Sequence, residues 1–333
     1  MLNPTQKLNP KLSDGKFNSA DIEQVPTRNG FGEGLLYLGE HNPEVVALTG
    51  DLAESTRVLE FAKKYPERFV ECGVAEQNMM GVAAGLALAG KTSFVASYAT
   101  FSPGRSWDQL RVSVAYSKTN VKVAGSHTGL SVGPDGATHQ AMEDIAIVRT
   151  IPNMTVVVPA DAIEARKTTI ALGTSAGPAY FRLGREKTPV MTTEDSPFQI
   201  GKADVWKEGK DVALIGCGPI LYAGLEAAQE LEKEGISVLI INNHTIKPMD
   251  VETIVWAAQM TGAVVTIEEH QVMGGAGSAV CEVLATHKPV PVEMIGAQDT
   301  FAESGKPEEL LKKYGMDKHA IKNAIIKVLK RKN

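Results

Sequence analysis

The sequence lacks an excess of positive charge and a paired-cysteine motif. Its 34 Lys and Arg residues against 39 Asp and Glu residues leave a formal net charge of −5. There is therefore no basic surplus to neutralise a nucleic-acid backbone or an anionic membrane. The three cysteines, Cys72, Cys217 and Cys281, stand in apolar runs without a CxxC spacing. They are typical of buried thiols in a reducing compartment, and we expect neither a disulfide nor a thiolate metal site.

Signals for membranes and export are also missing from the sequence. No apolar run reaches the ~18 residues that a membrane-spanning helix needs. The first residues, Met1 to Asp21, are polar and mixed in charge, without the apolar core of a signal peptide. We therefore expect a cytoplasmic protein with no nucleic-acid partner and no membrane partner.

The length of 333 residues favours two domains, since most domains hold roughly 100 to 200 residues. In both halves, short β-branched runs alternate with helical patterns. This alternation predicts an α/β fold with two domains, each a mostly parallel sheet with helices on both faces. The strands are expected at residues 45–48, 68–71, 92–95, 121–124, 155–158, 212–215, 238–241, 264–267 and 292–295.

A polar stretch with Pro189 and Pro197 separates the two halves. Such a stretch is typical of a linker that neither packs nor continues an element. We predict an N-terminal extension at 1–25, a first domain at 26–187, a linker at 188–199 and a second domain at 200–333. Residues 319–330 place apolar side chains at helical spacing and predict a closing amphipathic helix.

Glu76 is the most informative single residue of the first half. It follows a predicted strand and opens a helix whose continuation, Val82 to Ala89, is apolar and small, which predicts a helix that is buried all round. A carboxylate at this place could simply stabilise the first helical turn. Alternatively, burial would raise its pKa and let Glu76 hold a proton for a ligand nitrogen, as general acid–base chemistry requires.

A second polar cluster contains His127, Asp135 and His139, which follow one strand and a Gly-rich loop. Imidazoles and a carboxylate are the groups that exchange protons with sugar hydroxyls at neutral pH. A metal site is the competing interpretation, but the sequence shows neither HxH nor HExxH spacing. Solvated loop histidines without a role are a third interpretation.

Several ordered segments resemble the thiamine-diphosphate-dependent transketolase family, and most closely the C-terminal half of a transketolase. The resemblance covers the chain from about Val25 onward and implies a thiamine-diphosphate-binding pyrimidine (Pyr) domain followed by a transketolase C-terminal domain. The segments that carry it are Gly50-Asp51-Leu52-Ala53-Glu54-Ser55, Arg68 to Met79, a helix with Gly104-Arg105-Ser106-Trp107-Asp108-Gln109-Leu110-Arg111, and Gly125 to Asp161.

The resemblance implies a set of cofactor-binding residues. Glu76 matches the glutamate that hydrogen-bonds a ring nitrogen of the cofactor's aminopyrimidine and so helps to activate the thiazolium carbon. Tyr98 and Phe101 match aromatic residues that pack against the aminopyrimidine, and Tyr98 stands where the family usually has phenylalanine. Asp51 is expected among the cofactor-binding residues as well.

The resemblance also implies a substrate channel. His127, Asp135 and His139 match residues that contact the hydroxyls and the carbonyl of a sugar, and both histidines join Glu76 as expected catalytic residues. One serine and two arginines match the family residues that hold the substrate's terminal phosphate. This phosphate is a dianion, and arginine can bind it through bidentate hydrogen bonds. These residues are Arg28, Ser55 and Arg185.

One family motif is missing from this sequence. Transketolases bind the diphosphate and a divalent metal through a Gly-Asp-Gly segment followed by an Asn, and no such segment occurs here. The resemblance therefore implies one half of a split enzyme. We expect thiamine diphosphate to be shared with an N-terminal partner subunit that carries Mg²⁺ or Ca²⁺, with no metal on this chain. We also expect self-association through both domains, as a homodimer within a heterotetramer.

The function implied is that of the C-terminal subunit of a two-chain transketolase in the pentose phosphate pathway. The enzyme would transfer a two-carbon ketol unit from a ketose phosphate to an aldose phosphate. The nearest rival is the beta subunit of a thiamine-diphosphate-dependent 2-oxoacid dehydrogenase, with deoxyxylulose-phosphate synthase as a further relative. A non-catalytic regulatory subunit of the same fold is an alternative from a different class.

Overall fold

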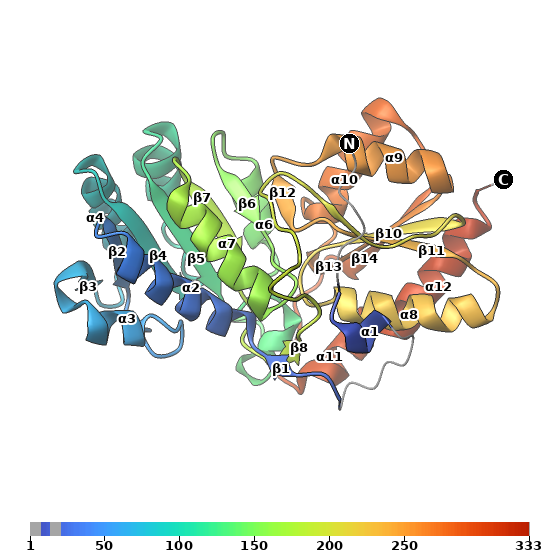
Figure 1. The fold of residues 1–333 in the computed structure, drawn as a ribbon, viewed down its shortest axis with the longest axis horizontal. Helices are drawn as coiled ribbons and strands as arrows, with labels where there is room; N and C mark the ends of the chain where they lie inside the picture. The colour runs from blue at the N-terminus through green and yellow to red at the C-terminus, as the bar shows by residue number, and fades with distance from the viewer. Residues whose placement is uncertain (1–7, 14–20, 333) are drawn as a thin grey trace.

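The computed structural model describes residues 8–13 and 21–332, which form two α/β units that lie side by side along the longest axis of the molecule (Figure 1). Each unit is built on a mostly parallel sheet with helices packed against it. The predicted fold class is therefore confirmed. None of the described helices combines the length and apolar character that crossing a bilayer demands.

The sheet of the first unit has seven strands in the order β12-β6-β7-β5-β4-β2-β3. Its neighbours are parallel except at β12. The interior strands are almost continuously apolar, as expected of a parallel sheet covered on both faces. The six strands from the first half are β2 (Val45–Thr49), β3 (Phe69–Glu71), β4 (Thr92–Tyr98), β5 (Val121–Ser126), β6 (Thr155–Val157) and β7 (Ala179–Arg182).

Two helices, α2 (Thr27–His41) and α7 (Ala162–Thr174), lie against each other over one face of this sheet (Figure 1). Their close approach needs a glycine, because a Cβ at Gly30 would stand 1.9 Å from the Ala162 carbonyl oxygen. The other helical segments are α1 (Pro10–Ser13), α3 (Leu59–Lys64), η2 (Pro66–Arg68), α4 (Glu76–Leu88), α5 (Trp107–Gln109), η3 (Leu110–Tyr116), η4 (Leu130–Asp135) and α6 (Asp144–Arg149).

Helix α4 differs from the expectation of a fully buried helix. Met79, Met80 and Ala83 are buried, but Gly81 and Gly85 face outward, and a Cβ at either position would meet nothing within 4 Å. Small apolar residues indicated burial, yet no described element covers this face. The helix expected over residues 104–111 also differs, since it begins at Trp107 and continues as the π-helix η3.

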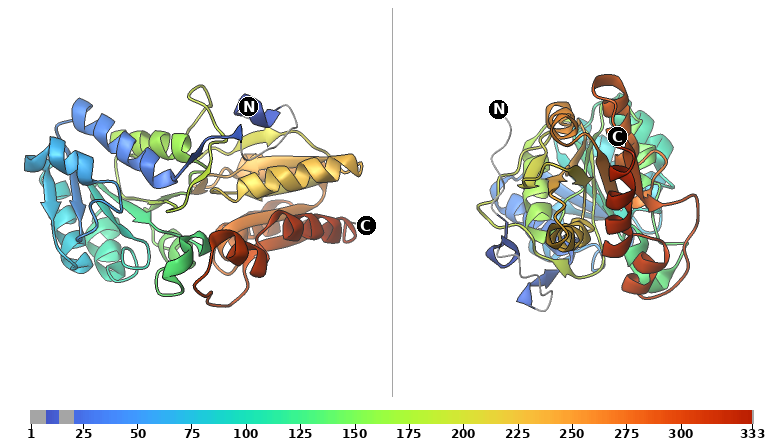
Figure 2. Two further views of the ribbon diagram at one scale, coloured as in Figure 1. Left: turned by 90° about the horizontal axis from the view of Figure 1, so that it is seen from below. Right: turned by 90° about the vertical axis from the view of Figure 1, so that its right-hand side faces the viewer.

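The second unit has a five-stranded sheet in the order β14-β13-β10-β11-β9, with only β9 antiparallel. Helices α8 (yellow) and α12 (red) pack together (Figure 2), and α9 also packs against α10. The strands are β9 (Asp204–Lys207), β10 (Val212–Gly216), β11 (Val238–Asn242), β13 (Val264–Gln271) and β14 (Val292–Ala297). The helices are α8 (Leu221–Lys233), α9 (Val251–Thr261), α10 (Ala276–His287), α11 (Pro307–Lys313) and α12 (Lys318–Leu329).

The two units share a strand. β12 (Thr245–Lys247) comes from the second half of the chain but pairs antiparallel with β6 of the first sheet. Lys247 then donates from Nζ to the carbonyl oxygens of Arg149 and Ile151, at 2.9 and 2.6 Å. The second unit therefore closes one edge of the first sheet, and the two are tied together by backbone pairing as well as by side chains.

The segment between the units is packed, contrary to the expectation of a non-packing linker. β8 (Thr188–Pro189) pairs with β1 (Gln24–Val25), and Met191 is fully buried. The Asp161 carboxylate accepts hydrogen bonds from the Met191 N–H, at 2.8 Å, and from the Thr192 N–H and hydroxyl. A carboxylate that caps α7 thus also holds the connecting segment, a link that local composition cannot reveal.

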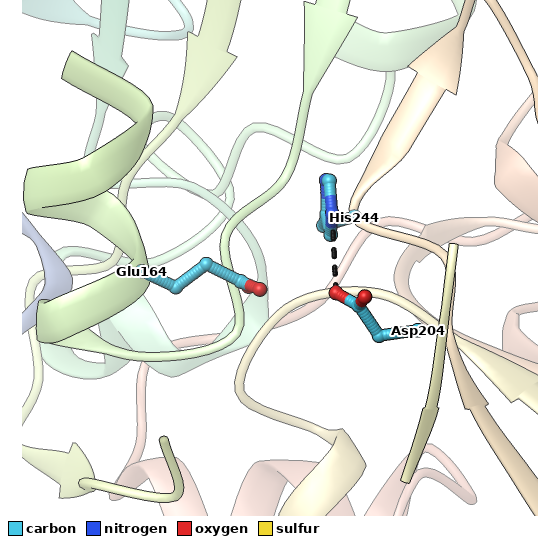
Figure 3. A group of neighbouring side chains, drawn as sticks. All are labelled: Glu164, Asp204 and His244. Atoms are coloured by element: carbon cyan, nitrogen blue, oxygen red, sulfur yellow. Dashed lines mark ion pairs between the residues drawn. The ribbon is translucent and has the colours of Figure 1, made fainter. Parts of the chain in front are cut away.

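Three buried polar side chains meet at the seam between the units (Figure 3). Glu164 comes from α7, Asp204 from β9, and His244 from the turn between β11 and β12. His244 Nε2 lies 3.4 Å from Asp204 Oδ2, and both side chains are at most 1% exposed. Burial alone would lower the pKa of His244, but Asp204 and Glu164 together raise it above its usual value. Burial raises the pKa of Glu164 to about 7.

Candidate functional site

The polar residues singled out in the first half gather beyond the carboxyl ends of its parallel strands. Asp51 and Ser55 follow β2, Glu76 follows β3, Tyr98 ends β4, and His127 follows β5. Parallel strands present their carboxyl ends at one edge of a sheet, and α/β proteins bind ligands at this edge. The alternation of strands and helices therefore brings together residues that are far apart in the sequence.

Glu76 begins α4 and is 3% exposed. Both of its carboxylate oxygens lie 3.2 Å from Nη1 of Arg105. Arg105 lies in the segment between β4 and α5, and its side chain is 49% exposed. The sequence predicted the burial of Glu76 correctly. It did not identify Arg105, because nothing in the residues around position 105 shows that they face the start of α4.

Aromatic rings form a wall that Arg105 links to Glu76. Tyr98 stacks on the imidazole of His127, with ring centroids 3.8 Å apart, and on Phe101 at 5.8 Å. His139 lies edge-on to Phe101 at 5.4 Å and to Tyr98 at 6.0 Å. Offset-stacked and edge-on contacts between aromatic rings are favourable. The packed rings together present a flat apolar surface. The structure thus brings four of the predicted residues into one cluster.

His127 has a left-handed backbone, with φ of 57°. Non-glycine residues seldom adopt this conformation, and it recurs at functional sites. Arg28 Nη1 lies 3.3 Å from Nε2 of His127, and the Ser126 hydroxyl lies 2.9 Å from its Nδ1. Because arginine can only donate, Nε2 accepts and the proton of the neutral ring resides on Nδ1. Burial lowers the pKa of His127 to about 3, with Arg28 and Arg185 adding to the effect.

Basic groups surround His127. Arg28 donates from Nη1 to the Ser55 carbonyl oxygen at 2.8 Å, while its buried Nε has no hydrogen-bond partner among the described residues. Burial lowers the pKa of Arg28, and Arg57 and Arg185 lower it further. The sequence interpretation missed Arg57, whose Nε donates to Asn29 Oδ1 at 2.9 Å. The positive potential of these arginines favours an anionic ligand.

Asp135 and Arg185, which were expected to touch different parts of a substrate, contact each other. Arg185 Nη1 donates to Asp135 Oδ1 at 3.2 Å and to the Val132 carbonyl oxygen at 3.0 Å. Asp51 lies on an exposed loop, where its N–H donates to Glu71 Oε1 at 2.7 Å. The structure therefore places Asp51 at the same edge of the sheet, but within residues 8–13 and 21–332 no side-chain bond gives it a role.

The second unit supports the loop that carries Asp135 and His139. Glu269, from β13, accepts a hydrogen bond from the Ser131 N–H of η4. Gln140 donates from Nε2 to the Glu303 carbonyl oxygen at 3.1 Å, and the Ala146 N–H donates to His270 Nε2 at 3.4 Å. The sequence interpretation assigned no role to this part of the second half, which here positions residues of the first.

Among the described residues, Glu164, Asp204 and His244 are the group whose ligand atoms lie close enough together, within 4.8 Å, to hold a metal ion. These side chains already contact one another and the backbone, since Glu164 Oε2 accepts from the Ala160 N–H and Oε1 from Asn242 Nδ2. They stand at the seam and come from different elements than the cluster around Glu76.

The cluster around Glu76 fits one side of a planar nitrogen heterocycle. A buried carboxylate can hold a proton for a ring nitrogen, and the face of Phe101 can pack on the ring. The arginines near His127 suit a phosphate. The described residues thus fit the aminopyrimidine end of thiamine diphosphate and a phosphorylated substrate.

Comparison with known proteins agrees with this geometry. Residues 23–191 match the transketolase pyrimidine-binding domain, and residues 201–321 match the transketolase C-terminal domain. One subunit of an apulose-4-phosphate transketolase from Phocaeicola vulgatus is 39% identical over 308 residues, covering 92% of this chain and 98% of that protein. Human transketolase is 36% identical over 307 residues, covering 91% of this chain but 49% of the human protein.

A solved structure shows the same pattern. It is described as a split-gene transketolase in an inactive β4 tetramer, and it shares 45% sequence identity with this chain. The TM-score is 0.87, and the match covers 93% of this chain and 100% of that one. The similarity to these two shorter proteins thus spans almost their whole length, whereas the match to the human enzyme spans about half of it.

Proposed function

We propose, from the premise that this chain belongs to the transketolase family, that it is the C-terminal subunit of a two-chain transketolase. The enzyme transfers a two-carbon ketol unit from a ketose phosphate to an aldose phosphate. The match along nearly the full length of the Phocaeicola vulgatus subunit and of a split-gene transketolase supports the division into two chains. We further propose a cytoplasmic enzyme of the pentose phosphate pathway, and the free cysteines fit a reducing compartment.

The observation that carries this proposal is the buried carboxylate of Glu76, which shares the Arg105 guanidinium with the ring of Phe101. Thiamine diphosphate, when bound, supplies a nucleophilic carbon and an electron sink for carbon–carbon cleavage. Glu76 would hold the proton shared with a ring nitrogen of the aminopyrimidine. Tyr98 and Phe101 would pack on that ring and exclude water, which strengthens the hydrogen bond to Glu76.

The residues around His127 would bind the sugar. Since its pKa is lowered to about 3, His127 would be neutral at pH 7, and its Nε2 would accept a hydrogen bond from a sugar hydroxyl. Its buried position makes it a poor site for a proton from bulk water. His139, which lies edge-on to Tyr98 and Phe101, and Asp135, which contacts Arg185, would bind further hydroxyls. A second group would bind the terminal phosphate: Arg28, Ser55, Arg185 and the newly identified Arg57.

A partner subunit would supply the rest of the site. The sequence contains no Gly-Asp-Gly segment, so the diphosphate and its Mg²⁺ or Ca²⁺ would be held by an N-terminal transketolase subunit. The relative described as an inactive β4 tetramer supports activity that depends on a partner. The outward face of α4, with Leu88 74% exposed, supports self-association or pairing through the first domain, within a heterotetramer.

Mixing experiments test this proposal. The purified chain and its N-terminal partner, alone and together, are assayed for ketol transfer between sugar phosphates and for pyruvate decarboxylation, with thiamine diphosphate and Mg²⁺. We expect ketol transfer by the mixture only. Pyruvate decarboxylation without ketol transfer would identify a 2-oxoacid dehydrogenase subunit instead. A mixture that neither turns over nor binds thiamine diphosphate would identify a non-catalytic subunit.

A further inference from the structure

Arg105 makes two contacts at once in the cluster around Glu76. Its Nη1 lies 3.2 Å from each carboxylate oxygen of Glu76. Its guanidinium carbon lies 4.1 Å from the centroid of the Phe101 ring, well within the range of a cation–π contact. A flat, nitrogen-bearing cation is thus held between a buried carboxylate and an aromatic face.

The two partners of this ion pair are unequally fixed. Glu76 is 3% exposed and belongs to the first turn of α4, while the Arg105 side chain is 49% exposed. The carboxylate therefore belongs to the framework, and the guanidinium reaches it from the surface on a flexible stem. Ion pairs whose cation is half exposed to water contribute little to stability. A ligand that offers Glu76 a better partner can displace Arg105.

These contacts coincide with those that the proposed function assigns to the cofactor. The aminopyrimidine would need a hydrogen bond to Glu76 and a face of Phe101, and Arg105 takes both. We propose that the Arg105 guanidinium is a place-holder for the aminopyrimidine. In the chain without cofactor, the guanidinium balances the buried charge of Glu76, and it must move aside when thiamine diphosphate binds. This inference rests on the proposed function, and it adds a competitor for the cofactor within the chain itself.

The segment that carries Arg105 allows such a movement. It leads through the short helix α5 into the seven-residue π-helix η3, a geometry often found at functional sites. Gln77 Nε2 donates to the Arg105 carbonyl oxygen at 3.3 Å, which anchors the backbone beside α4. The side chain can therefore leave Glu76 while its backbone stays in place.

Cofactor affinity tests the inference. Thiamine diphosphate is titrated by calorimetry, in the presence of Mg²⁺, into the assembled two-chain enzyme with wild-type, Arg105→Ala or Arg105→Met chains. In both variants the cofactor no longer has to displace Arg105 from Glu76. We therefore expect thiamine diphosphate to bind about fivefold more tightly to both. The matched control is Arg111→Ala, an exposed arginine of the same segment, which should leave the dissociation constant unchanged. Arg105→Met keeps the apolar stem should Arg105→Ala fold poorly.

A double-mutant cycle localises the effect. The gain from Arg105→Ala should vanish in a Glu76→Gln background, because the neutral amide no longer holds the guanidinium. Unchanged or weaker binding by both Arg105 variants, or an equal gain in both backgrounds, would overturn the inference and leave the proposed function standing. If the wild-type assembly binds no thiamine diphosphate, the proposed function fails and the place-holder fails with it.

Discussion

His127 and His244 are both almost completely buried, at 2% and 0% exposure, yet their surroundings carry opposite charge. Arg28 and Arg185 add to the effect of burial and lower the pKa of His127, whereas Asp204 and Glu164 overcome the effect of burial and raise that of His244. The imidazole at the edge of the first sheet is therefore held neutral, whereas the carboxylates at the seam favour the protonated form of His244. One histidine therefore lies in the candidate binding site, and the other lies between carboxylates inside the fold.

The two regions also differ in how their carboxylates are paired. At the seam, Asp161 accepts from three backbone N–H groups, and Glu164 accepts from the Ala160 N–H and from Asn242. At the sheet edge, the side-chain partner of Glu76 among the described residues is a half-exposed guanidinium. Polar groups that the chain saturates itself stabilise its fold, while groups paired with a mobile side chain can exchange that partner for a ligand. The comparison thus separates a structural cluster from a binding one.

The largest expected effect comes from Glu76→Gln. If Glu76 holds a proton in catalysis, the amide should lower the turnover number of the assembled enzyme by at least ~100-fold, with little change in melting temperature. Steady-state assays and thermal unfolding measure the two quantities. Glu60→Gln, an exposed carboxylate on α3, is the control and should leave both unchanged. Full turnover in Glu76→Gln would show that this carboxylate is not the catalytic group.

The next largest effect should come from Asp204→Ala at the seam. Removing one member of a buried ion pair leaves the other uncompensated, at a cost of about 3 kcal/mol in the free energy of unfolding. Urea denaturation measures this cost, with the exposed Asp195→Ala as the control. Cofactor affinity of the folded enzyme should not change. A variant as stable as the wild type would mean that the seam does not depend on this pair.

Arg185 provides a test of the proposed phosphate binding at the sheet edge. Losing a charge-assisted hydrogen bond to phosphate costs roughly 1.5 kcal/mol, so Arg185→Ala should raise the Michaelis constant for phosphorylated donors by about tenfold. Unphosphorylated donors should be affected much less. The adjacent, exposed Lys187→Ala is the control. Equal effects on both kinds of donor would assign Arg185 to holding Asp135 and not to binding phosphate.

Local patterns predicted nine strands of the two large sheets but missed β7, β9 and β12. Runs such as Val45–Thr49 and Val212–Gly216 are strongly apolar and β-branched, and the structure buries every residue in them. Glu76 stood out because an acid before an apolar helix is unusual. Arg105 carries no such mark, because its pairing with Glu76 depends on how the segment after β4 folds back over α4.

The seam could not be predicted for a similar reason. Glu164, Asp204 and His244 are separated by long stretches of sequence and meet only because β12 crosses into the sheet of the other unit. The connecting segment at residues 188–199 contains the polar and proline residues of a linker, yet Asp161 fastens it. Contacts between distant parts of a chain leave little trace in the composition of either part.

The most direct test of the contrast is the pH dependence of stability. In the folded protein the pKa of His127 is about 3, against roughly 6.5 when unfolded. Folding favours the neutral form of His127. Its contribution to the free energy of unfolding is therefore complete above pH 6.5 and is lost as the pH falls toward 3. The loss is at most about 1.4 kcal/mol for each pH unit. His127→Gln should therefore gain stability relative to the wild type between pH 7 and pH 5.

His244 should show the opposite sign. Because its folded pKa is raised, its contribution is complete below pH 6.5 and is lost as the pH rises through the folded value. The stability deficit of His244→Gln relative to the wild type should therefore shrink as the pH rises from 6 to 8.5. Urea unfolding of both variants and the wild type across this range and down to pH 5 measures the two slopes. Slopes of the same sign would contradict the opposite charge environments, because neighbouring arginines and neighbouring carboxylates shift the pKa of an imidazole in opposite directions.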